Sequence, residues 1–242
     1  MLCSSYMNIA VVIPTKNEER CLPMLLHALK NQTVQVDEIM IGDGWSTDAT
    51  REIALRYGAK VVDGGSPSLG RNAGATATSS DLIIFFDADA IIDDIHFIEK
   101  AIADFAMRKL DTATADIFVR RGTLTDRLGF YFYNFYVRMW GNRHPHLIGT
   151  FIMVRRSVCE KIGGFDTAVT FAEDHDFGLR AKKEGAKFGV LNGIRVGITP
   201  RRQEKIGRLR FLLVNALAEP YIMFFGPIKS RWFARQYESR SM

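Results

Sequence analysis

The sequence predicts an α/β fold in which a mostly parallel central sheet is flanked by helices. Short apolar runs of strand length alternate with helical segments over the first half of the chain, the pattern of parallel strands joined by crossover helices. Glycine-rich turns separate several of these segments. The chain has 242 residues, 47% of them hydrophobic and 24% charged, which suits one globular domain with a tail.

Proline and glycine residues mark the ends of several predicted strands and helices in the first half. Pro14 closes the first apolar run, and Gly58 ends a helical segment that starts at Thr47. The second run ends at the Gly-Asp-Gly of 42–44, and a Gly/Pro loop at 64–67 precedes a short helix. The strands expected here are 9–13, 36–41, 60–62 and 82–86, and the expected helices are 17–30, 47–57 and 70–78.

The second half alternates less regularly. Ser157 and Glu160 have capping-box spacing and predict the start of a short helix, while Gly185 ends another helix. Residues 122–140 are rich in aromatic side chains. The strands expected here are 113–119, 147–154, 187–191 and 195–198, and the expected helices are 94–110, the one that begins at 157, and 173–184.

Polar residues follow three of the predicted strands: Thr15, Asp43, and the pair Asp87 and Asp89. Because ligands of open parallel sheets bind at the carboxyl ends of strands, these residues predict one nucleotide-like site. Two carboxylates after a buried strand are costly unless they meet a cation or a charged ligand. Asp-x-Asp supplies the hard oxygen ligands that Mg²⁺ or Mn²⁺ takes while holding substrate phosphates.

Five motifs follow one another in an order that resembles the family 2 glycosyltransferases, which have the GT-A fold. Each motif is loose, but the order is specific, and the resemblance covers about residues 8–200. The motifs are VVIPTKNEE at 11–19, DGWSTDAT at 43–50, GRNAG at 70–74, DAD at 87–89, and a last region with GGFD at 163–166 and EDHDFGLR at 173–180.

The resemblance implies a metal-assisted, inverting transfer of a sugar from a UDP- or GDP-sugar to an acceptor sugar or a polyprenyl-linked lipid. Such an enzyme is a hexosyltransferase of EC class 2.4. Mg²⁺ or Mn²⁺ would neutralise the charge that develops on the departing diphosphate. Processive members of the family carry a Gln-x-x-Arg-Trp motif beyond the general base, and none follows Asp174. We therefore expect the addition of a single sugar.

The resemblance also implies roles for single residues. Asp174 is the implied general base, and Glu173 supports it or contacts the acceptor. Asp89 is the implied metal ligand, and Asp87 contacts the ribose or the metal. Arg71 is implied near the diphosphate, which suits a guanidinium group. The other residues expected in the site are Pro14, Thr15, Glu18 and Asp43 for the donor nucleotide, and Gly149 and Thr150 for the acceptor pocket.

Cysteine and histidine usage predicts no zinc site. Cys3, Cys21 and Cys159 lack paired spacing, and a sparse, odd number of cysteines fits a reducing cytosol. His144 and His146 are expected in a loop. His175 is expected at a solvated helix position rather than as a metal ligand.

Two other functions compete with the transferase. Sugar-phosphate nucleotidyltransferases also use an α/β sheet and a metal, but they need a Gly-rich, basic loop after the first strand, and 14–19 contains no glycine. A membrane-surface adaptor could keep the fold without catalysis. The acidic positions oppose this alternative, since carboxylates repel phosphate groups unless a metal intervenes.

Positive charge is concentrated in the C-terminal part. From Arg195 onward there are 10 Lys and Arg against 3 Asp and Glu, whereas the whole chain has a net charge of +5. Residues 211–228 are largely apolar but interrupted by Asn215, Glu219 and Pro220, which disfavours a spanning helix. Basic flanks around apolar residues suit a membrane surface. The alternative is that the segment packs on the core or on another subunit.

These observations predict three regions: a tail at 1–7, the glycosyltransferase domain at 8–200, and a basic amphipathic helical extension at 201–242. The N-terminus lacks the basic and apolar segments of a signal peptide. We expect a cytoplasmic protein, peripheral on the inner face of the cell membrane through its C-terminal extension, with no nucleic-acid partner.

Overall fold

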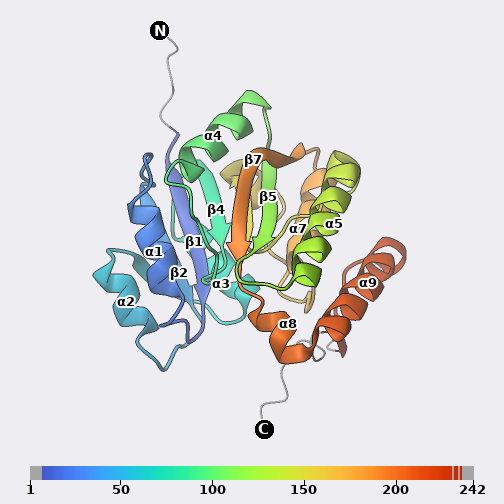
Figure 1. Cartoon of the computed structure of the whole chain (residues 1–242). Coiled ribbons are helices and arrows are strands. Elements are labelled where there is room, and N and C mark those ends of the chain that lie inside the picture. The colour runs from blue at the N-terminus through green and yellow to red at the C-terminus, as the bar shows by residue number, and fades with distance from the viewer. Residues whose placement is uncertain (1–6, 231, 234, 236–242) are drawn as a thin grey trace.

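The computed structural model describes residues 7–230, 232–233 and 235. A seven-stranded sheet forms the centre, and helices cover it (Figure 1). The predicted fold class is confirmed. The strands are β1 Ile9–Thr15, β2 Glu38–Asp43, β3 Lys60–Asp63, β4 Leu82–Phe86, β5 Thr112–Val119, β6 Phe151–Arg155 and β7 Phe188–Ile198. The helices are α1 Leu22–Lys30, α2 Thr50–Arg56, α3 Pro67–Thr76, α4 Phe97–Met107, α5 Leu124–Trp140, α6 Arg156–Lys161, α7 Glu173–Lys183, α8 Arg201–Ile206 and α9 Arg208–Phe225.

The strand order is β3-β2-β1-β4-β6-β5-β7. Six strands run in the same direction, because β1 pairs parallel with β2 and β4, β2 with β3, and β5 with β7. Strand β6 pairs antiparallel with both β4 and β5. The amino end of β6 therefore lies at the same edge of the sheet as the carboxyl ends of its neighbours.

Successive side chains of β1 enter different cores, as the two-residue period of a strand requires. Val11 and Ile13 pack in one core with α1 and α4, whose buried residues include Leu25 and Phe97. Val12 packs in the other core, to which α5, α6 and α7 contribute. A sheet covered on both faces explains why its strands read as continuous apolar runs.

Several expected elements are shifted or merged. The helix expected from 17 begins at Leu22, because Asn17 has a left-handed φ of 55° that helices do not continue. The strands expected at 187–191 and 195–198 form one strand, β7, with a register shift against β5. The strand expected from 147 begins at Phe151. The aromatic stretch is α5, which starts with a capping box between Thr123 and Asp126.

Close backbone approach positions α3. A Cβ at Gly42, in β2, would overlap the carbonyl group of Gly70, so this pair of glycines lets α3 lie against the end of β2. The next residue of α3 is Arg71, which enters the site described below.

The extension packs on the domain. Val214, Ala218 and Ile222 form one buried row of α9, at helical spacing, in a small core that also contains Phe171 and Leu179. The opposite side of α9 exposes large apolar side chains, among them Leu213 and Phe224. No helix formed by the described residues is long and apolar enough to cross a bilayer.

Candidate functional site

The carboxyl ends of β2, β1 and β4 meet, since these strands are neighbours in the sheet. Thr15 ends β1, Asp43 ends β2, and Asp87 follows β4 directly. The hydroxyl of Thr15 donates a hydrogen bond to Asp43 Oδ1 over 2.9 Å. Asp87 N–H donates to the carbonyl of Thr150 over 3.4 Å, which joins the antiparallel strand β6 to the same edge. The residues predicted at three strand ends are brought together.

Asp43 is fully buried, and protein groups use both of its oxygens. Ser46 donates its hydroxyl to Oδ1 (2.5 Å) and its N–H to Oδ2 (3.0 Å), and Arg51 Nη1 lies 3.2 Å from Oδ2. Burial opposes the charged form, but the hydrogen bonds from Ser46, Thr15 and Arg51 outweigh it and lower the pKa of Asp43. Asp43 therefore fixes the shape of the loop after β2 as an ionised carboxylate.

Negative charge gathers around Glu18. Burial raises the pKa of this carboxyl group, and the charges of Asp89 and Asp87 raise it further, while Arg201 acts in the opposite direction. Arg201 begins α8 and has its Nη1 3.8 Å from Glu18 Oε2. The charges of Asp87 and Asp89 thus act on Glu18, and carboxylates are the hard oxygen ligands that Mg²⁺ and Mn²⁺ take.

Arg71 joins the donor-side and acceptor-side acids. Its Nη2 lies 2.7 Å from Asp87 Oδ1, and its Nη1 lies 2.9 Å from Glu173 Oε1. The side chain is only 3% exposed. Burial opposes its charge, yet Asp87, Glu173 and Asp174 together raise the pKa of Arg71 above its ordinary value. A buried guanidinium with two carboxylate partners is a rigid bridge between segments that lie far apart in the sequence.

Asp174 lies in the first turn of α7, beside Arg71. Its Oδ2 accepts a hydrogen bond from Gly149 N–H (2.6 Å), and its Oδ1 accepts one from His175 N–H (2.8 Å). Burial and the nearby charge of Glu173 raise the pKa of Asp174 to about 7, against the lowering influence of Arg71. A carboxyl group with this pKa exchanges protons near neutral pH, as a general base must.

Gly149 lies in the middle of the site. A Cβ added to it would be 3.0 Å from Arg71 Nη2, 3.3 Å from Asp174 Oδ2 and 3.7 Å from Asp87 Oδ2. Thr150, the next residue, is buried. The two residues expected on the acceptor side thus lie against the acids expected to act on donor and acceptor.

Asn72 holds the turn that precedes the acidic segment. Its side chain donates to the carbonyl of Phe165 and accepts from the N–H of Phe165, both over 2.8 Å. Gly164, with a φ of 71°, packs directly against this amide. Ala172 has a left-handed φ of 56° just before Glu173, so the backbone is strained where it enters the site.

The expectation that His175 is solvated is wrong. The side chain is 3% exposed and lies beside His144 and His146, which do occupy a loop as expected. One ligand atom from each of these histidines and from Glu219 lies within 4.8 Å of the others. Spacing along the chain gave no sign of this group because three separate segments form it. Arg201, which lies beside Glu18, was also not predicted in the site.

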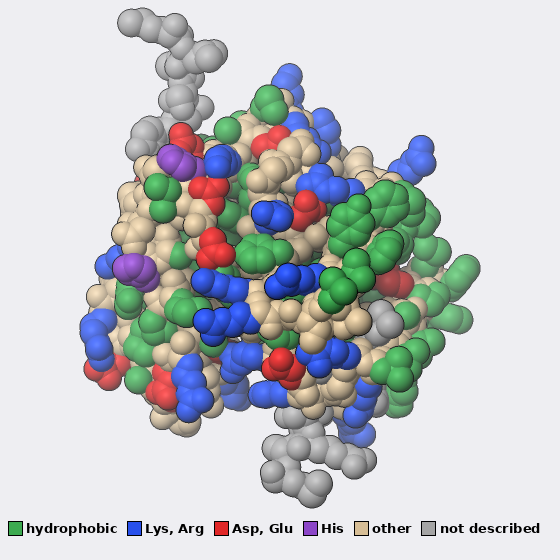
Figure 2. Space-filling view, viewed as in Figure 1, with side chains coloured by type: hydrophobic (Ala, Val, Ile, Leu, Met, Phe, Trp, Pro, Cys, Tyr) green, Lys and Arg blue, Asp and Glu red, His purple; other side chains and the backbone are tan. Residues whose placement is uncertain are grey.

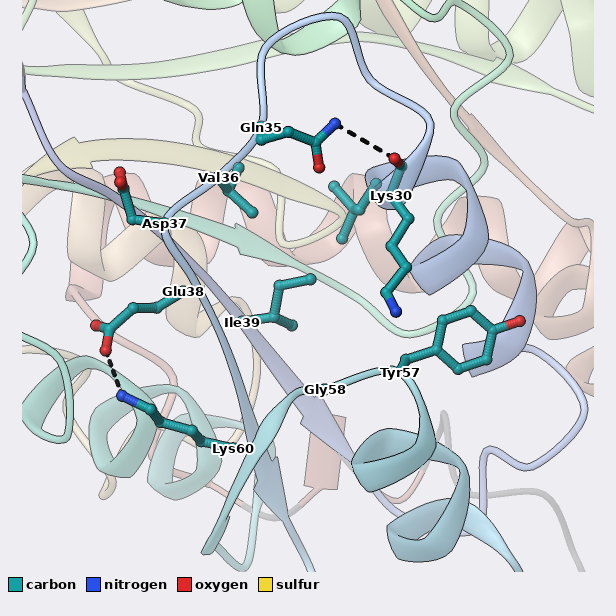
Figure 3. A pocket seen from close by; sticks show the side chains of 10 residues that line it. Lys30, Gln35, Val36, Asp37, Glu38, Ile39, Tyr57, Gly58 and Lys60 are labelled. Carbon is teal, nitrogen blue, oxygen red and sulfur yellow. Dashed lines mark hydrogen bonds and ion pairs between the residues drawn. The ribbon is translucent and has the colours of Figure 1, made fainter.

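Two hollows in the described part of the chain lie away from this site. One is at the amino ends of β2 and β3, where Lys30, Glu38, Tyr57 and Lys60 line it (Figure 3). The other lies between β5, β7 and α5, and Asn134 and Arg195 are among its lining residues. On the face shown in Figure 2, Lys and Arg gather near the centre, and hydrophobic side chains cover the region of α5 and α9.

Comparison with known proteins identifies the family. The model of glycosyl transferase family 2 matches residues 10–163, which contain the strand ends, Arg71 and Gly149. The chain belongs to glycosyl transferase family 2. The resemblance predicted from the motifs is confirmed, and the remaining acidic residues, Glu173 and Asp174, lie just beyond the matched segment.

Curated proteins that are named as glycosyltransferases match part of the chain. A 4,4'-diaponeurosporenoate glycosyltransferase of Staphylococcus haemolyticus is 38% identical over 111 residues, which are 42% of this chain and 29% of that protein. A protein with the same name from Staphylococcus aureus is 37% identical over 93 residues, 35% of this chain and 24% of that protein. The match thus spans under a third of these relatives.

Solved structures of other glycosyltransferases share the GT-A fold. A structure of Staphylococcus aureus TarS with UDP-GlcNAc has a TM-score of 0.65 at 21% identity, over 80% of this chain and 58% of that one. The mannosyltransferase PcManGT of Pyrobaculum calidifontis, in complex with GDP-Man and Mn²⁺, has a TM-score of 0.69 at 18% identity. That match covers 96% of this chain and 73% of the other.

Proposed function

We propose that this chain transfers a single sugar from a nucleotide-diphosphate sugar to an acceptor, with inversion at the anomeric carbon. The observation that carries the proposal is the Arg71 bridge, which holds Asp87 on the donor side within 2.7 Å and Glu173 on the acceptor side within 2.9 Å. Asp174 adjoins the same bridge. Donor and acceptor groups thus meet at one edge of the sheet.

The donor side is proposed to hold the nucleotide diphosphate and a divalent ion. Asp89 and Asp87 are the proposed ligands of Mg²⁺ or Mn²⁺, and the crowded charge around Glu18 supports a cation there. When bound, such an ion stabilises the charge on the leaving diphosphate. The proposed contacts of the nucleotide are Pro14, Thr15, Glu18, Asp43 and Arg71.

The acceptor side is proposed to hold a hydroxyl group against Asp174. The hydroxyl oxygen attacks the anomeric carbon, the bond from that carbon to the diphosphate oxygen breaks, and the hydroxyl proton passes to Asp174. The raised pKa of Asp174 suits this proton transfer near neutral pH. Gly149, Thr150 and Glu173 are the proposed acceptor contacts.

Binding and activity measurements test this function. UDP and GDP are titrated into the chain by calorimetry with and without Mn²⁺, and we expect binding that requires the metal. A screen of UDP- and GDP-sugars for slow hydrolysis in the presence of Mn²⁺ then identifies the donor. Nucleotide binding that ignores Mn²⁺, with no sugar release, would contradict the proposal.

A membrane surface is the proposed location of the acceptor. Helix α5 exposes large apolar side chains, and α9 does so on the side away from its buried row. Basic residues such as Lys205 and Lys229 flank α9. This arrangement supports peripheral contact on the cytoplasmic side and a polyprenyl-linked acceptor. The exposed residues are Leu124, Leu128, Tyr131, Phe132, Phe135 and Met139 of α5, and Leu209, Leu213, Leu217, Met223, Phe224 and Phe225 of α9.

Vesicle sedimentation tests the membrane contact. We expect the chain to sediment with vesicles that contain anionic lipid, and Leu213→Gln with Phe224→Gln to reduce the bound fraction. Leu55→Gln, an exposed apolar residue of α2, is the control. Equal binding of all three proteins would count against α9 as the contact.

A further inference from the structure

Four side chains form a cluster that the proposed transfer does not use. His144 and His146 come from the loop before β6, His175 from the first turn of α7, and Glu219 from α9. One ligand atom of each lies within 4.8 Å of the other three. The imidazole rings of His146 and His175 stack with centroids 4.1 Å apart, and the ring of His144 lies 4.9 Å from that of His175.

Four ring nitrogen atoms of these histidines are buried and lack a hydrogen-bond partner. His146 is 2% exposed and His175 is 3% exposed. Neither ring nitrogen of His175 has a hydrogen-bond partner, and neither do Nε2 of His146 and Nε2 of His144. An unsatisfied buried polar group destabilises the folded state, so four such atoms in one place need an explanation.

The histidines are in the chemical state that binds metals. Both His146 and His175 are buried, which favours the neutral imidazole, and their unpartnered ring nitrogens can offer a lone pair. His146 Nε2 lies 3.4 Å from Glu219 Oε2, but a neutral ring makes no ion pair there. The hydroxyl of Tyr136 donates to the same Glu219 oxygen over 3.5 Å, as an outer partner of a ligating carboxylate would.

We propose that His144, His146, His175 and Glu219 bind one structural Zn²⁺ ion. Three imidazoles and one carboxylate are a ligand set that zinc takes in tetrahedral geometry. With metal–ligand bonds of about 2.0–2.2 Å, the ligand atoms of a tetrahedral site lie roughly 3.5 Å from one another. The two ligand atoms that are farthest apart here, within 4.8 Å, would therefore approach each other by about 1 Å when zinc binds. The carboxylate oxygens around Asp87 and Asp89 suit Mg²⁺ or Mn²⁺ instead, so the two ions occupy separate sites.

The zinc ion would join three segments at the acceptor side. His175 directly follows the proposed general base, and the loop that holds His146 leads to Gly149. Glu219 lies on the buried side of α9, next to Ala218. One ion would therefore fix the position of Asp174, the acceptor loop and the C-terminal helix relative to one another. This inference does not depend on the proposed function.

Metal analysis of the full chain tests the proposal. The untagged protein is stripped with a chelator, supplied with Zn²⁺, dialysed, and its metal measured by mass spectrometry. We expect about one zinc per chain and a higher Tm, because a ligand of the folded state stabilises it. Replacing Zn²⁺ by Co²⁺ should give the visible absorption of a tetrahedral cobalt site.

Variants assign the ion to this cluster. His146→Ala and the milder Glu219→Gln should each weaken zinc binding more than tenfold, whereas the exposed His27→Gln and His96→Gln should retain it. Asp87→Asn with Asp89→Asn should also retain it. The proposal is overturned if the reconstituted wild type holds no zinc, a result that needs no variant to fold. It is equally overturned if His146→Ala retains the zinc or the Asp87/Asp89 variant loses it.

Discussion

The backbone N–H of Gly149 donates a hydrogen bond to Asp174 Oδ2 over 2.6 Å. This contact ties the start of the antiparallel strand β6 to the first turn of α7, and Gly149 leaves no room for a side chain between Arg71 and Asp174. The proposed general base is thus held by a backbone group rather than by another side chain.

Gly149→Ala should disturb this arrangement. The added Cβ would be 3.0 Å from Arg71 Nη2 and 3.3 Å from Asp174 Oδ2, tighter than ordinary contact. We expect kcat to fall roughly 10- to 100-fold, since small misplacements of reacting groups are costly, while Tm changes little. Steady-state kinetics and thermal unfolding measure the two effects. Gly129→Ala in α5 meets no atom within 4 Å, and it should behave as the wild type.

Asp174 should set the pH dependence of activity. Its pKa is raised by burial and by Glu173, so the reactive carboxylate forms only as the pH rises toward about 7. We expect the rate to increase with pH through that range and Asp174→Asn to lower kcat about 10²- to 10⁴-fold for a hydroxyl acceptor. A mild loss would indicate a phosphate acceptor, which is already anionic. The exposed Asp93→Asn is the control.

The same group should make the wild type less stable at high pH. A pKa raised in the folded state means that folding favours the protonated form. The stabilising contribution is therefore complete below the unfolded pKa of about 4 and is lost as pH rises through about 7. The Tm of Asp174→Asn minus that of the wild type should grow with pH over this window. A difference that stays constant from pH 4 to pH 8 would refute the raised pKa.

Arg71→Lys should damage both stability and function. An ammonium group cannot reproduce the two-armed contact with Asp87 and Glu173, and it leaves a buried cation without one of its two carboxylate partners. We expect a loss of about 3–5 kcal/mol in unfolding free energy, together with weaker donor binding. Denaturant unfolding measures the loss of unfolding free energy, and nucleotide titration measures the affinity for the donor. Arg56→Lys changes an exposed pair with Glu52 and should cost under about 1 kcal/mol.

Asp89→Asn should raise the Mn²⁺ concentration required for half-maximal activity at least tenfold, because it removes one of two proposed carboxylate ligands. Activity is measured over a range of Mn²⁺ concentrations. Asp94→Asn, an exposed carboxylate paired with Lys100, should leave the metal requirement unchanged. An identical metal dependence in both variants would exclude Asp89 as a ligand.

The sequence was informative where a signal is local. Strand β4 has the bounds that its apolar run predicted. All residues of the run are buried and Asp87 follows directly, so the sequence marks where the strand ends. The strand ends converged as expected, because parallel topology follows from the alternation of elements. The start of α5 was also readable in principle, since Thr123 and Asp126 form its capping box.

Features that depend on pairing across the fold were not predicted. The reversal of β6 is decided by its partners β4 and β5, which no short motif encodes. Burial of His175 depends on the loop of His144 and His146 and on α9, segments separated by tens of residues. The merged strand β7 needed the parallel partner β5 to hold its two halves together.

The antiparallel strand β6 separates the two stretches of sequence that supply the proposed site residues. The proposed donor contacts come from the first 90 or so residues, whereas the proposed acceptor contacts come from residues just before the antiparallel strand β6 and from α7. The two sets share one edge but have separate stretches of sequence. Under the proposed function, substitutions in the later segment would change the acceptor contacts without altering the residues proposed to hold the activated sugar.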